Sequence, residues 1–106
     1  MWKRIESGIS ARSVEFDFLS WVKGYAANLG LMGATFMKKD GSIEIIAEGE
    51  EKNLTKLAKK LEKGDLFSRV ENFYVKWMEP KKEFDNFSVM TEEQYHDSLV
   101  SGEEKL

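Results

Sequence analysis

Apolar residues in the first third of the chain follow two different spacings. Near residues 3–11 they alternate, with Ile5 and Ile9 on the same side, which predicts a strand with one buried face. Farther along they recur at intervals of three and four, which predicts a helix over about 18–29 that Gly30 caps. A strand followed by an amphipathic helix is therefore expected at the start of the chain.

A β-hairpin and a second helix are predicted next. Strands near 31–38 and 42–48 flank Asp40-Gly41, a pair that is typical of two-residue hairpin turns. Leucines spaced by three and four then predict a helix over about 50–63.

Two further strands complete the pattern. β-Branched and aromatic residues over about 69–78 favour a strand that Pro80 stops, and residues 84–90 can form a short edge strand. The order is β-α-β-β-α-β with one added edge strand. It predicts an α+β protein of the ferredoxin-like split βαβ class, in which two helices cover one face of an antiparallel sheet.

Composition indicates the class of protein. The 106 residues allow one compact domain, predicted to span residues 1–90, and 42% hydrophobic and 33% charged residues are typical of a soluble globular chain. No apolar run reaches the roughly 18 residues that a membrane helix needs, and no apolar stretch follows the basic start as it does in a signal peptide. We therefore expect a cytoplasmic protein that does not enter a membrane.

The charge distribution and the missing residue types argue against several other kinds of function. The chain has no cysteine and one histidine, which excludes disulfides, thiolate chemistry and two-histidine metal motifs, so neither a metal nor another cofactor is expected. Residues 91–106 hold five acidic residues and one lysine, which leaves 1–90 nearly neutral and argues against nucleic-acid binding. This acidic tail is predicted to be a short helix to about Val100, begun by a capping box of Thr91 and Gln94, or a disordered end.

Several strings in a fixed order resemble the acylphosphatase family. They are AANLGLMG, the DG turn, IEIIAEGEEKNL, SRVENFYVKWMEP and FDNFSV, and the resemblance covers roughly residues 4–90. It implies hydrolysis of acyl phosphates by a small enzyme without a cofactor. In that family a loop before the first helix and an arginine at the helix start hold the phosphate, and an asparagine after the second strand positions the attacking water.

The family's catalytic side chains are missing at the matching positions. Counting back from Ala26 in AANLGL places the arginine position at Leu19, whereas a match through VEF places it at Asp17. The asparagine position, four residues after Gly33, holds Met37. Neither match supplies the cation, and methionine cannot orient a water.

The loop that matches the family's phosphate loop also departs from the pattern. It comprises Arg12, Ser13, Val14, Glu15, Phe16, Asp17 and Phe18. It lacks the family's glycines, and Glu15 and Asp17 would oppose a bound phosphate by on the order of 1 kcal/mol each. Arg12 and Lys38 are the cations that could replace the arginine, although Lys38 is expected to point to the opposite face of its strand.

Two classes of function stay open. The leading hypothesis is a catalytically degenerate acylphosphatase-like domain, a pseudoenzyme that serves in binding or assembly with an unknown protein or a small anionic ligand. The alternative is an active acylphosphatase with a relocated cation. A third hypothesis, less favoured than these two, is a small-ligand or nucleic-acid module that uses the same fold. Other conspicuous residues receive structural roles: the lysines of 50–63 form a solvated helix face, and His96 has no assigned role. Four aromatic residues, Trp21, Tyr25, Phe73 and Trp77, are assigned to the core.

Overall fold

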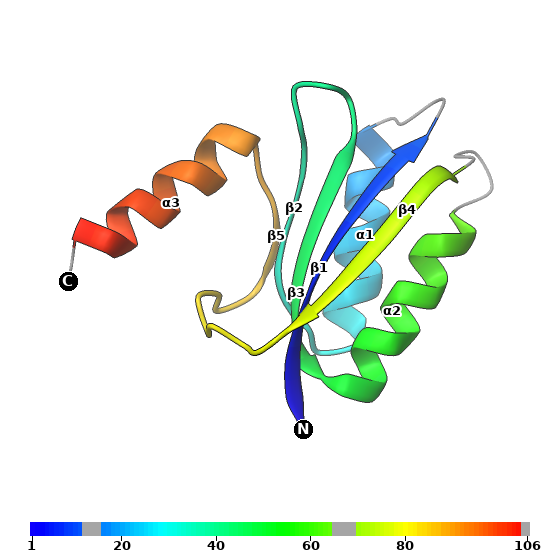
Figure 1. Cartoon of the computed structure of the whole chain (residues 1–106), viewed down its shortest axis with the longest axis horizontal. Coiled ribbons are helices and arrows are strands. Elements are labelled where there is room, and N and C mark those ends of the chain that lie inside the picture. The colour runs from blue at the N-terminus through cyan, green and yellow to red at the C-terminus, as the bar shows by residue number, and fades with distance from the viewer. Residues whose placement is uncertain (12–15, 65–69, 105–106) are drawn as a thin grey trace.

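The computed structural model describes the backbone of residues 1–11, 16–64 and 70–104, and the side chains of 1–10, 18–64 and 70–98. The elements in chain order are β1 (Trp2–Ala11), α1 (Phe16–Asn28), β2 (Met32–Met37), β3 (Ile43–Glu50), α2 (Glu51–Lys63), β4 (Val70–Met78), β5 (Phe87–Val89) and α3 (Glu92–Glu104). The predicted α+β order is confirmed, and α1 and α2 lie together on one face of the sheet (Figure 1).

The five strands form one sheet in the order β4-β1-β3-β2-β5. β1 pairs antiparallel with β3 and β4, and β2 pairs antiparallel with β3. β5 runs parallel to β2, with Phe87 opposite Gly33. The prediction of a wholly antiparallel sheet was therefore wrong, because the connection after β4 carries the chain to the far edge of the sheet before β5 begins (Figure 1).

The main core lies between the helices and the sheet. Ile5, Ile9 and Ile45 from the strands are at most 1% exposed and pack with apolar residues of α1 and α2. Trp21, Tyr25 and Phe73 lie at the margin of this core. Trp77 is 42% exposed, so its assignment to the core was wrong; it lies on β4, an edge strand of the sheet.

Two predicted turns have different outcomes. Gly30 adopts a φ of 72° and caps α1, with its N–H donating to the Ala27 carbonyl at 2.9 Å. In the hairpin, the Lys38 N–H donates to the Ser42 carbonyl at 2.8 Å, which leaves three residues in the loop. The predicted two-residue turn was wrong, because Gly41, at φ 87°, takes the third, left-handed position of that loop.

The second face of the sheet is partly covered by the end of the chain. Tyr95 of α3 stacks on Phe36 of β2 at a ring distance of 5.0 Å, beside Ile46. The predicted capping box is confirmed, since the Thr91 N–H donates to Gln94 Oε1 at 2.8 Å and the Gln94 N–H donates to Thr91 Oγ1 at 3.0 Å. α3 continues beyond the predicted end near Val100. None of the helices in the described part combines the length and apolar character required to cross a bilayer.

Candidate functional site

Leu19 and Met37, which one match to the family places at its arginine and asparagine positions, meet in one pocket. Leu19 enters it from α1, and Met37 enters it from the end of β2. The pocket has a volume of about 420 Å³. Its described lining consists of Leu19, Met37, Val89, Met90, Thr91 and Gln94. No charged side chain is among these described residues.

Strand register explains why Met37 faces this pocket. Met37 pairs with Ile43, and Thr35 pairs with Ile45, so both residues of β2 share the side of the sheet that α1 covers. Met37 is the last residue of its strand and is 38% exposed, whereas Leu19 is only 4% exposed. The pocket is therefore apolar at its base and open at the sheet edge.

The start of α3 closes the other side of the pocket. Thr91 and Gln94 belong to the capping box, in which each side chain bonds the backbone of the other residue. Tyr95 anchors this turn on the opposite face of β2 by stacking on Phe36. The sequence predicted the capping box but gave no sign that it lies beside Leu19 and Met37.

The described lining of the pocket suits apolar groups better than phosphate. A phosphate group requires hydrogen-bond donors or cations to offset its loss of hydration, and the described lining offers only the hydroxyl and amide of the capping box. No described side chain here can act as a cation, and none can act as a carboxylate or imidazole base. The described lining can bind an apolar group, and it includes neither an arginine nor an asparagine.

Most of the predicted phosphate loop lies outside the described residues. These are Arg12, Ser13, Val14 and Glu15, and the side chains of Phe16 and Asp17 at the start of α1 are also outside the description. Phe18 is buried in the main core at 1% exposure. Both matches for the arginine position, at Leu19 and at Asp17, therefore stay predictions.

Lys38 points away from the pocket, as predicted. Its Nζ lies 3.9 Å from Oε2 of Glu44 on the other face of the sheet. There Glu44 also accepts a hydrogen bond from the Tyr74 hydroxyl at 3.1 Å. Burial raises the pKa of Glu44, although the Tyr74 hydrogen bond and Lys38 oppose the shift. Lys38 is thus engaged with a carboxylate on the face opposite Leu19 and Met37.

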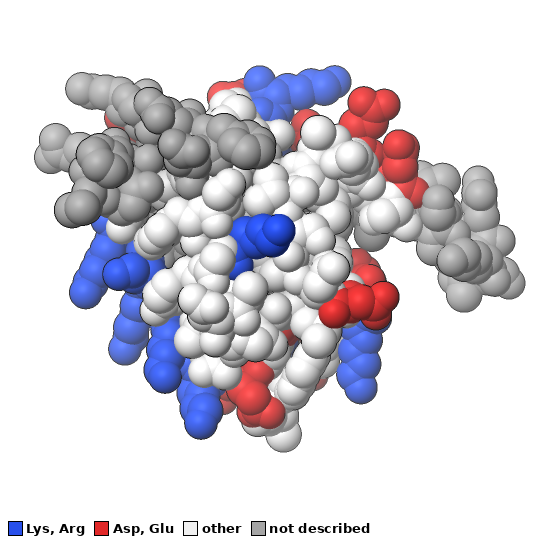
Figure 2. Space-filling model, turned by 180° about the vertical axis from the view of Figure 1, so that it is seen from behind, with Lys and Arg blue, Asp and Glu red and all other residues white. Residues whose placement is uncertain are grey.

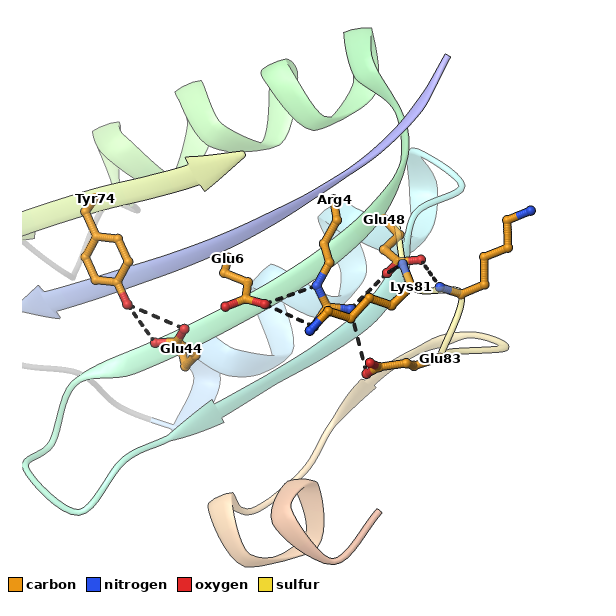
Figure 3. A network of polar contacts seen from close by, with 8 residues as sticks. Arg4, Glu6, Glu44, Glu48, Tyr74, Lys81 and Glu83 are labelled. Atoms are coloured by element: carbon orange, nitrogen blue, oxygen red, sulfur yellow. Dashed lines mark hydrogen bonds and ion pairs between the residues drawn. The ribbon is translucent and has the colours of Figure 1, made fainter. Parts of the chain in front are cut away.

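A second polar cluster on that face was not foreseen. Arg4 is 1% exposed and lies among Glu6, Glu48 and Glu83 (Figure 3). Its Nη1 donates to Oε2 of Glu48 at 2.9 Å. Three carboxylates around one guanidinium form a structural ion-pair network, since none of these residues lines the pocket of Leu19 and Met37.

Glu48 ties the connection after β4 to the sheet. It accepts a hydrogen bond from the backbone N–H of Lys81 at 2.8 Å (Figure 3). A second one comes from the backbone N–H of Lys82 at 2.9 Å. Burial alone would raise the pKa of Glu48, but these two bonds and Arg4 outweigh it, and the pKa is lowered. Through these two hydrogen bonds Glu48 holds the segment that leads to β5, and β5 forms one wall of the pocket of Leu19 and Met37.

The described residues contain no cluster of side chains that could bind a metal ion. No group of three or more His, Asp or Glu side chains there could hold an ion. His96 is exposed and has Glu92 at 3.9 Å, one turn earlier in α3.

Comparison with known proteins gives consistent matches. A family model of acylphosphatases matches residues 15–89. The acylphosphatase of Caldanaerobacter subterraneus subsp. tengcongensis is 33% identical over 64 residues, which are 60% of this chain and 71% of that protein. The acylphosphatase of Mycolicibacterium smegmatis is 30% identical over 85 residues, which are 80% of this chain and 87% of that protein.

Solved structures agree at the level of the fold. The crystal structure of acylphosphatase from Bacillus subtilis superimposes with a TM-score of 0.77 and 26% identity, over 85% of this chain and 99% of that chain. A bacterial light-regulated adenylyl cyclase gives a TM-score of 0.69 at 18% identity, over 99% of this chain and 34% of that chain. This second likeness is one of fold alone.

Proposed function

The chain belongs to the acylphosphatase family, and from that premise we propose that it is a catalytically degenerate member that serves in binding or assembly. The single observation that carries the proposal is the apolar pocket lined by Leu19 and Met37, the residues that one match to the family places at its arginine and asparagine positions. Both changes remove polar groups from the same place. The pocket keeps its position in the fold and loses its means of holding a phosphate and a water.

The expected loss of catalysis is large. Removing one preorganised donor or charge costs about 3–4 kcal/mol of transition-state stabilisation, which is roughly 10²–10³-fold in rate. Removing both, even with incomplete additivity, should leave acyl-phosphate hydrolysis near the uncatalysed background.

The proposal is tested by the release of phosphate from benzoyl phosphate. A catalytically competent family member serves as the positive control, and we expect no turnover by this chain above buffer. The competing candidate is an active acylphosphatase with a relocated cation, and the relatives that carry the name acylphosphatase favour it. Hydrolysis well above buffer that Arg12→Ala abolishes would establish that candidate and overturn the degenerate one.

A restoration series separates the missing groups from the altered loop. Leu19→Arg with Met37→Asn returns the two side chains, but Glu15 and Asp17 still carry negative charge where phosphate would bind. We expect little activity from that pair and measurable activity only after Glu15→Gly and Asp17→Gly are added. Circular dichroism must accompany each variant, because Leu19 is buried and an arginine there can unfold the chain.

The proposal extends to the organisation of the chain and its setting. We place the acylphosphatase-like domain at residues 1–90 and treat 91–106 as an appended acidic tail, which is supported by a family match that ends at residue 89. We further propose a cytoplasmic location and an unknown protein or a small anionic ligand as the partner.

A further inference from the structure

Four lysines of α2 form a stripe that neither the pocket nor the core explains. Lys56, Lys59, Lys60 and Lys63 follow the spacing i, i+3, i+4, i+7, which places them on one side of the helix. All four are exposed. Figure 2 shows a row of basic side chains along the left edge of the helix face, where α2 lies.

These lysines border a hollow between the two helices. The hollow has a volume of about 220 Å³, and Tyr25 of α1 is its only described lining residue that is not a lysine of α2. Lys60 Nζ lies 5.8 Å from the centre of the Tyr25 ring, and that ring is itself stacked on Trp21 at 6.2 Å. The hollow therefore has a supported aromatic wall and a cationic rim.

The stripe has an energetic cost inside the protein. Like charges three or four residues apart repel one another and destabilise a helix. Within the described residues, no carboxylate lies within 4.0 Å of the ammonium group of any of the four lysines, so no close ion pair offsets the repulsion. An anion that reaches several of these lysines at once would offset it.

We propose that this lysine groove, formed by Lys56, Lys59, Lys60, Lys63 and Tyr25, binds a small soluble anion that carries at least two phosphate groups. The stripe from the first to the last lysine runs about 10 Å along the helix, which suits a compact multivalent anion. A single phosphate would reach only part of it. The hollow favours a small molecule over the flat face of an acidic protein, and the nearly neutral body lacks the broad basic surface that nucleic acid requires.

The groove is separate from the proposed degenerate site. Leu19 lies near the start of α1 and Tyr25 near its end, and the two hollows share no described residue. Binding at the groove therefore does not depend on whether the chain hydrolyses acyl phosphates.

The test is a titration of the ¹⁵N-labelled full chain with tripolyphosphate at about 0.15 M salt, where distant surface charges are screened. We expect saturable shifts at the amides of residues 56–63 and Tyr25. Lys59→Gln with Lys63→Gln should weaken binding about tenfold or more, since a hydrogen bond to a charged group is worth roughly 1.5–3 kcal/mol. Glutamine keeps the helix propensity of lysine, so α2 should persist.

A matched control removes the same charge elsewhere. Lys39→Gln with Lys76→Gln changes two exposed lysines outside the groove and should leave the affinity within about twofold, because their charges are screened. The proposal is overturned if tripolyphosphate causes no saturable shifts, if sodium chloride of equal ionic strength causes the same shifts, or if the control pair weakens binding as much as the groove pair. Binding to vesicles of phosphatidylserine without a response to tripolyphosphate would also overturn it, in favour of a lipid surface.

Discussion

Removal of the Glu48 carboxylate should cost this protein a large part of its stability. In the folded chain Glu48 pairs with a guanidinium that is 1% exposed and accepts two backbone N–H groups from the connection after β4. Breaking a buried ion pair from one side costs about 3–5 kcal/mol, because the remaining charge stays buried without its partner. The whole free energy of unfolding of a small domain is about 5–15 kcal/mol. We therefore expect Glu48→Ala to lose about 3–5 kcal/mol in urea unfolding followed by tryptophan fluorescence.

Two further variants locate the origin of this loss. Glu83→Ala removes a carboxylate that lies 3.7 Å from Arg4 and is 29% exposed, so it should cost less than about 1 kcal/mol. Arg4→Met with Glu48→Leu removes both buried charges and should be more stable than Glu48→Ala. It should stay below the native chain, since the N–H groups of Lys81 and Lys82 still lose their acceptor. A loss for Glu48→Ala as small as that for Glu83→Ala would refute the idea that the pair is buried and matters for stability.

The lowered pKa of Glu48 predicts that its contribution to the free energy of unfolding depends on pH. Burial opposes ionisation of Glu48, but its hydrogen bonds outweigh burial and lower its pKa from the ordinary value of 4.5. A lowered pKa in the folded state means that the stabilisation is complete above the unfolded value and is lost as the pH falls towards the folded value. The difference in unfolding free energy between the native chain and Glu48→Ala should therefore be constant near neutral pH and shrink below about pH 4.5.

Two other substitutions test the backbone and the wall of the pocket. Gly33→Ala should destabilise the chain by more than about 3 kcal/mol in urea unfolding, because φ is 153° there and a Cβ would run into a carbonyl oxygen of β3. At Gly24 a Cβ meets open space, so Gly24→Ala should be neutral or stabilise the chain by up to about 1 kcal/mol. Equal effects of these two changes would contradict the close approach of the strands. Thr91→Ala breaks the capping box with Gln94 and should cost about 1 kcal/mol at the start of α3. The loss should appear as faster amide exchange of residues 92–95. Unchanged exchange would show that the capping box does not hold this turn.

The sequence by itself determined the kinds of elements and most of their boundaries. Apolar residues at two distinct periods are a local property, and each period implies which side of a strand or helix is buried. Gly30 likewise marks a helix end by its own conformational freedom. The prediction that Leu19 and Met37 stand where the family has polar groups also came from the sequence alone, since it rests on spacing within AANLGL and from Gly33, and a second match leaves Asp17 open.

Only the tertiary structure decided what lies against these elements. Arg4 and Glu48 are 44 positions apart, and the alternation of β1 indicated merely that Arg4 faces away from the helices. It is buried because the end of the chain covers that second face, and periodicity within one strand contains no information about what covers it. For the same reason β5 pairs parallel with β2, and Thr91 and Gln94 reach the pocket of Leu19 and Met37. These contacts depend on where a long connection returns the chain, and that is set by packing over the whole fold.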